Sequence, residues 1–64
     1  MTIGEKLLIH RKRAKMTQKE IAQKMGIEQT QYSTYEVGKN QIPIKYLIIA
    51  CREYNCTPND IIEV

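Results

Sequence analysis

The chain has 64 residues, of which 42% are hydrophobic, and its formal net charge is +3. A chain of this length buries only about 60% of the surface that it exposes when unfolded, so a deep pocket or a large cofactor would leave too little core. No apolar run approaches the ~18–20 residues that cross a bilayer, and the start of the chain lacks the apolar region and cleavage site of a signal peptide. We therefore expect residues 1–64 to form one cytoplasmic domain without a membrane partner.

The first predicted helix spans residues 2–15. One arc of its helical wheel holds the side chains expected to face inward, which are Ile3, Leu7, His10, Arg11 and Ala14. Residues 1–19 carry six Lys or Arg and one Glu, whereas residues 20–64 carry four basic and six acidic residues. A basic segment of this kind favours a polyanionic partner such as nucleic acid or an anionic surface, although a charged segment alone is usually a solvated face.

The next two predicted helices, 17–25 and 28–36, meet at a tight turn. Thr17 and Glu20 fit an S/T-x-x-E capping box, in which each side chain bonds the backbone amide of the other residue. Gly26 supplies the left-handed residue that ends the first of these helices. The side chains expected to face the core are Ile21, Ala22, Met25, Tyr32 and Tyr35.

The last two predicted elements are a helix over 43–54 and a short turn that begins at Thr57. Pro43 suits the first helical position, and one side of this helix carries Ile44, Leu47, Ile48, Cys51 and Tyr54. A strand over 42–49 is the alternative, because Ile is common in strands. However, Pro43 lacks the amide that a central strand needs. The predicted fold is therefore all-α.

Neither a metal site nor a catalytic set is recognisable. Cys51 and Cys56 are five residues apart, which fits no CxxC motif, and His10 is the single histidine. The chain offers no Ser-His-Asp set and no phosphate loop. We expect no enzymatic activity, metal, cofactor or small-molecule substrate, and we expect both thiols to be buried as small apolar groups.

The outer face of the predicted helix 28–36 carries short or amide-bearing side chains. They are Gln29, Thr30, Ser33 and Thr34, with Gln31 at the flank. Amide side chains can pair bidentately with adenine, and a Thr methyl can meet the thymine methyl. An ordinary solvated face is the alternative, but a nearly uncharged polar face beside a basic segment suits base reading while other elements hold phosphates.

This sequence resembles the lambda-repressor-like helix-turn-helix family of phage repressors and XRE-type regulators. The resemblance covers about residues 3–62, and its matching residues are Arg11, Thr17, Gln18, Glu20, Ile21, Ala22, Met25, Gly26, Ile27, Tyr32, Tyr35, Glu36, Gly38, Lys39 and Pro43. It implies a compact five-helix domain with the helix-turn-helix at about 17–36. It also implies a transcriptional regulator, a repressor that binds a palindromic DNA operator as a homodimer through the major groove.

The resemblance assigns roles to individual positions. The family's base-reading positions are occupied by Gln29, Thr30 and Thr34, with Gln31 and Ser33 at the edge of this set. Gln18 would contact a phosphate while bonding Gln29, and Lys39 and Asn40 match positions that grip the DNA backbone. Arg11 and Glu36 match an internal ion pair.

Two positions depart from the family pattern. Glu28 stands where the family usually has a Ser or Thr N-cap, and its carboxylate would repel a nearby phosphate. The segment from Gly38 to Asn55 is one residue longer than is usual, so Ala50 and Cys51 compete for one core position.

Surplus apolar side chains mark candidate dimer contacts. The resemblance favours a group near the C-terminus, which consists of Tyr46, Ile49, Ile62 and Val64. Leu8 and Ile9 form a second possible surface. A homodimer would set two reading helices ~34 Å apart. The alternative function is that of an antitoxin or interaction module whose main partner is another protein.

Overall fold

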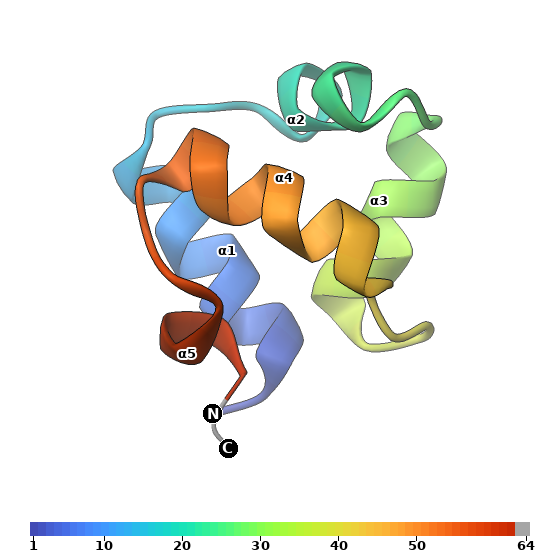
Figure 1. Ribbon diagram of the computed structural model, residues 1–64. Helices are drawn as coiled ribbons and strands as arrows, with labels where there is room; N and C mark the ends of the chain where they lie inside the picture. Colours follow the sequence, from blue (N-terminus) through green and yellow to red (C-terminus); the bar gives the residue numbers. More distant parts are fainter. Residues whose placement is uncertain (63–64) are drawn as a thin grey trace.

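A computed structural model describes residues 1–62 and contains five helices (Figure 1). They are α1 (Ile3–Arg13), α2 (Gln18–Met25), α3 (Gln29–Val37), α4 (Ile44–Tyr54) and α5 (Pro58–Ile61). The described residues include no strand, so the predicted all-α, five-helix fold is confirmed.

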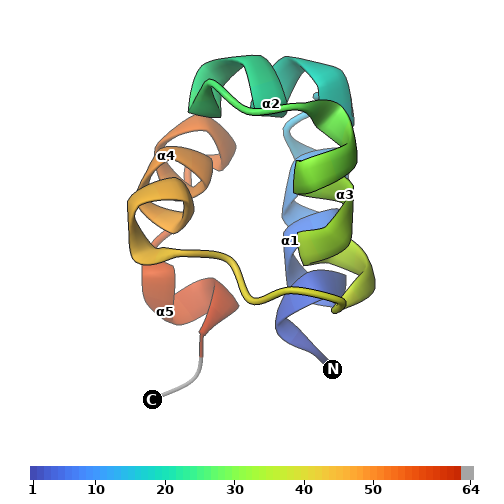
Figure 2. The same ribbon diagram turned by 90° about the vertical axis from the view of Figure 1, so that its right-hand side faces the viewer.

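The helices form two layers that α2 bridges at one end. α1 and α3 lie in one layer, and α4 and α5 lie in the other (Figure 1 and Figure 2). The core fills the space between these layers and beneath α2. Its buried side chains are Leu7, Ile21, Ala22, Met25, Tyr32, Tyr35, Leu47, Ala50, Cys51, Tyr54 and Ile61.

Local signals define where α2 begins and ends. The Thr17 amide donates to Glu20 Oε1 at 2.9 Å, and the Glu20 amide donates to Thr17 Oγ1 at 3.1 Å, which completes the predicted capping box. Gly26 ends the helix in the left-handed region, at φ 73°. The predicted boundaries of this helix are thus confirmed. A second capping box opens α1, and at the start of α5 the Thr57 amide and hydroxyl both donate to Asp60 Oδ2. No side chain caps α3 or α4.

The fourth helix is rotated relative to the prediction. Ile44 and Ile48, which were expected to face the core, are 65% and 45% exposed. Ala50 and Cys51 are both buried, so these two residues share the core rather than compete for one position. Leu47, Cys51 and Tyr54 are buried as predicted, and the Tyr54 hydroxyl is hydrogen-bonded inside the molecule. Pro43 is the N-cap and not the first helical residue.

The closest approach between α1 and α3 occurs at Gly4. This residue is buried, and a Cβ added to it would collide with the backbone carbonyl of Glu36 and lie 2.8 Å from the carbonyl oxygen of Tyr35. Both neighbours are backbone, which cannot rotate away as a flexible side chain can. The packing of α1 against the end of α3 therefore requires a residue without a side chain.

A polar cluster around the Glu36 carboxylate joins four helices. Its members, which we call the Glu36 cluster, are Arg11, Gln18, Tyr32, Glu36 and Tyr54. Glu36 Oε2 accepts from Arg11 Nε and from the Tyr32 hydroxyl, both at 2.7 Å. Glu36 Oε1 accepts from Gln18 Nε2 at 2.9 Å and from Arg11 Nη2 at 3.2 Å. Because both oxygens are satisfied, the carboxylate tolerates a site where its side chain is only 5% exposed.

The two tyrosine hydroxyls donate their protons in sequence, from Tyr54 to Tyr32 and from Tyr32 to Glu36. The hydroxyls of Tyr32 and Tyr54 are 2.7 Å apart. A phenol has a single proton, and Tyr32 donates its own to Glu36, so Tyr54 must donate to Tyr32. Burial raises the pKa of both hydroxyls, which remain neutral donors. Burial also tends to raise the pKa of Glu36, but the hydrogen bonds from Arg11, Tyr32 and Gln18 outweigh it and lower this pKa below its usual value.

We predict that Glu36→Gln lowers the free energy of unfolding at pH 7 by about 3–5 kcal/mol, because it leaves the Arg11 guanidinium largely buried without its counter-charge. The pKa of Glu36 is lower when folded than when unfolded, so the unfolded chain binds more protons near pH 4. The wild-type protein therefore loses this stabilisation as the pH falls from about 5, and the difference from the variant narrows. Urea unfolding at a series of pH values measures both effects.

Glu28→Gln is the matched control, since Glu28 is an exposed carboxylate at the start of the same helix and makes no capping bond. It should change the free energy of unfolding by less than about 1 kcal/mol. Parallel pH profiles for wild type and Glu36→Gln would contradict the role assigned to this carboxylate.

A second prediction compares the two tyrosines. Tyr32→Phe removes a donor to Glu36 and leaves the Tyr54 hydroxyl without its acceptor, so it should cost about 1–3 kcal/mol. Tyr54→Phe removes one neutral hydrogen bond and leaves Tyr32 bonded to Glu36, so it should cost about 0.5–1.5 kcal/mol. Urea unfolding of both variants decides the order. If Tyr54→Phe proves the more damaging variant, the inferred direction of donation is wrong.

Candidate DNA interface

The structure places the predicted base-reading positions along α3. Gln29, Thr30 and Gln31 are exposed on its first turn, and Ser33 and Thr34 are half-buried on the next. Tyr32 and Tyr35, which alternate with them, are buried in the core. α3 thus has an apolar face that anchors it and a polar face that remains accessible.

Hydrogen bonds separate these five residues into free and engaged side chains. Among the residues that the structure describes, the side chains of Gln29, Thr30 and Ser33 make no hydrogen bond. The Gln31 amide donates to the Tyr35 hydroxyl at 3.1 Å. The Thr34 hydroxyl donates to the carbonyl of Gln31 at 2.6 Å. Gln29 and Thr30 therefore combine exposure with a complete set of unused donors and acceptors.

Gln18 is placed differently from the expectation. Its amide donates to Glu36 rather than to Gln29, so the predicted bond between Gln18 and Gln29 is not made. An ionised carboxylate is a stronger acceptor than a neutral amide, so the Gln18 side chain bonds Glu36 in preference to Gln29. Gln29 is left free as a consequence.

The N-terminus of α2 retains donors of its own. The first residues of a helix have no intrahelical acceptor for their amides, and Thr17 satisfies only the amide of Glu20. The backbone amides of Gln18 and Lys19 are therefore available to a phosphate group, whose negative charge the helix dipole also favours.

The loop after α3 supplies the other predicted phosphate contacts. Gly38 turns the chain at φ 86°, and the amides of Lys39 and Asn40 donate to the carbonyl of Thr34 at 3.0 and 3.3 Å. Lys39 is exposed. The Asn40 side chain donates to the Thr34 hydroxyl at 3.1 Å, which fixes the loop to the polar face of α3.

The candidate dimer residues are less accessible than other apolar side chains. Tyr46, Ile49 and Ile62 are half-buried and pack against the core, and Val64 lies outside the described residues. Leu8 and Ile9 are also half-buried. The large apolar side chains that are exposed in the described part of the chain are Met1, Ile3, Val37, Ile44 and Ile48.

Two residues support this interface in ways that were not predicted from the sequence. Gly4 was not singled out, because nothing local in the sequence marks a glycine that must contact a backbone about thirty positions away. Tyr54 was expected only to fill the core, although a buried tyrosine hydroxyl usually needs a hydrogen-bond partner. That requirement was a usable signal for a polar contact inside the molecule.

The described residues contain no helix that is both long and apolar enough to span a membrane. Within the same part of the chain, no three His, Cys, Asp or Glu side chains gather in a way that could hold a metal ion.

Comparison with known proteins identifies the family. The sequence matches none of the curated proteins with which it was compared. The helix-turn-helix family of the XRE and lambda-repressor-like type matches residues 7–61, which include α2, the turn at Gly26 and α3. This match covers most of the chain and the whole candidate interface. The protein belongs to the XRE and lambda-repressor-like family of DNA-binding helix-turn-helix regulators.

Proposed function

We propose that residues 1–64 act as one domain, a cytoplasmic repressor that reads a palindromic operator with α3 in the major groove. The observation that carries this proposal is the pair of free side chains, Gln29 and Thr30, on a helix whose opposite face is buried. Their hydrogen-bonding groups suit the edges of bases exposed in the major groove.

Phosphate contacts would flank the reading helix on both sides. The free amides of Gln18 and Lys19 lie at the start of α2, and Lys39 lies in the loop after α3. With α3 in the groove, these two groups can approach the two backbones that border it, and such contacts set the register of a protein on DNA. The Gln18 side chain is engaged by Glu36, so its role would be to align α2 with the end of α3.

The two-fold symmetry of the proposed operator requires a homodimer. We place the contact near the C-terminus, where Ile62 lines an apolar groove together with Ile3, Ile42 and Ile44. Tyr46, Ile49 and Val64 remain part of the proposed surface as neighbours of this groove along the chain. Binding of a different protein is the second candidate function, and the exposed Val37, Ile44 and Ile48 favour it.

Selection of bound sites from random duplex DNA tests the main proposal. A sequence-specific dimer should return an inverted repeat whose half-sites are one helical turn apart. Enrichment of no sequence, together with binding that does not weaken as salt increases, would favour a protein partner instead.

We predict that Gln29→Ala weakens binding to the selected site by about 1–3 kcal/mol and relaxes the preference at one base pair. Gln23→Ala, which removes an exposed amide from α2, is the matched control and should leave the selected sequence unchanged. Repeating the selection with each variant measures the preference. An unaltered preference for Gln29→Ala would remove Gln29 from the set of base-reading residues.

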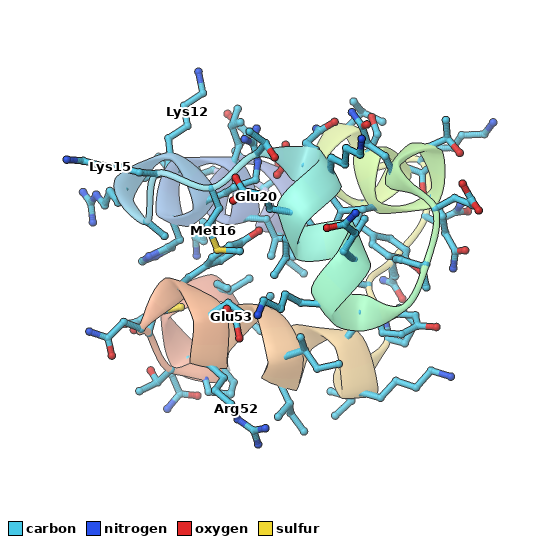
Figure 3. All side chains as sticks on the ribbon, turned by 90° about the horizontal axis from the view of Figure 1, so that it is seen from above. Lys12, Lys15, Met16, Glu20, Arg52 and Glu53 are labelled. Carbon is cyan, nitrogen blue, oxygen red and sulfur yellow. The ribbon has the colours of Figure 1, made fainter. Side chains whose placement is uncertain are left out.

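A different result is expected for Lys39→Ala. This change should weaken binding to all sequences alike and reduce the slope of log affinity against log salt by about one for each bound protomer, because each protomer then neutralises one phosphate fewer. Arg52→Ala is the control, since Arg52 points away from the layer of α1 and α3 (Figure 3). Fluorescence-anisotropy titrations at several salt concentrations measure the slope, and equal slopes for the two variants would refute the phosphate contact.

A further inference from the structure

The stretch from Lys6 to Lys19 contains six basic residues and no acidic one. Two glutamates border it, and both are occupied by helix caps. Glu5 Oε1 accepts from the Thr2 amide, and Glu20 Oε1 accepts from the Thr17 amide, each at 2.9 Å. The nearest carboxylates in the sequence are thus directed to backbone amides rather than to the lysines.

The structure separates these cations by their surroundings. Arg11 belongs to the Glu36 cluster. Lys6 and Arg13 line a shallow pocket between α1 and α5 that also includes Asp60. The remaining three, Lys12, Lys15 and Lys19, are exposed and form no ion pair with the residues that the structure describes. We call these three residues the lysine patch.

Backbone geometry fixes the turn that carries the lysine patch. Lys15 occupies the left-handed region at φ 57°, and its amide donates to the carbonyl of Lys12 at 3.0 Å. The amide of Met16 donates to the carbonyl of Arg11 at 3.2 Å, while Arg11 Nη1 donates to the carbonyl of Met16 at 3.0 Å. Because Arg11 also bonds Glu36, one side chain connects this turn to the end of α3.

The placement of the lysine patch extends the candidate DNA interface. Lys12 and Lys15 project outward at the end of α1, and Lys12 points away from α4, whereas Arg52 points to the opposite side (Figure 3). Lys19 follows Gln18 directly in the first turn of α2, where the backbone amides are free. The patch therefore continues from the proposed phosphate site at the start of α2 toward the end of α1.

We propose that the lysine patch is a second phosphate-binding site, which contacts the duplex backbone outside the bases that α3 reads. This inference rests on the proposed function, because it presumes a duplex lying against α2 and α3. Lysine ammonium groups without internal partners release condensed counterions when they meet phosphates. Phosphate contacts carry no sequence information of their own, so the patch adds affinity and register without changing the preferred bases.

The test compares two double variants that each remove two positive charges. Lys12→Gln with Lys15→Gln removes two members of the patch, and Lys45→Gln with Arg52→Gln removes two exposed cations from α4. Anisotropy titrations use a fluorescein-labelled duplex of random sequence over a range of salt concentrations. Thermal unfolding checks that both variants remain folded, as expected for exposed side chains.

The patch variant should reduce the slope of log affinity against log salt by about 0.9 for each phosphate that the protein no longer neutralises, and thus by nearly two for each bound protomer. The α4 variant should change the slope by less than half of that amount. Site selection with the patch variant should return the same sequence as the wild type.

Three other results would overturn the proposal, and they can be told apart. Equal slope changes in both variants would show that only net charge matters, and would overturn the proposal. A wild-type slope retained by the patch variant would overturn it while leaving the proposed function intact. Failure of the wild-type protein to bind any duplex would overturn both.

Discussion

The position of the candidate reading helix depends on one buried carboxylate. Glu36 lies at the end of α3 and receives hydrogen bonds from Arg11 of α1, Gln18 of α2 and Tyr32 of its own helix, with Tyr54 of α4 bonded behind Tyr32. A carboxylate can be kept in an apolar interior only when its oxygens are satisfied. The four helices must therefore adopt one relative arrangement, and this requirement orients the outer face of α3.

The same cluster also determines which side chains remain available to DNA. Because Glu36 accepts a hydrogen bond from the Gln18 side chain, Gln18 is directed away from Gln29, and Gln29 keeps its full hydrogen-bonding capacity. On the other side of α3, Asn40 is bonded to Thr34, and the exposed Lys39 supplies the positive charge of that loop. Fixed groups thus support the interface, and few groups are left free to contact bases or phosphates.

Features encoded by neighbouring residues were predictable from the sequence. The capping box of Thr17 with Glu20 and the left-handed Gly26 depend on backbone groups within a few residues, and the structure has both. Features that depend on distant contacts were not predictable. In α4, Leu47, Cys51 and Tyr54 are buried as expected, but the helices packed around α4 leave Ile44 exposed and bury Ala50 instead. The choice of Glu36 as the partner of Gln18 likewise requires that both helices already be packed.

The uncapped start of α3 has a consequence for recognition. Glu28 forms no side-chain bond to the first amides of this helix, whereas α1 and α2 each begin with a reciprocal cap. A first turn without such a lock opens and recloses more readily than the rest of its helix. The residues that we propose to meet the bases therefore lie on a turn of α3 that no reciprocal cap holds, which is the part of this helix best able to adjust to sites that differ from the best operator.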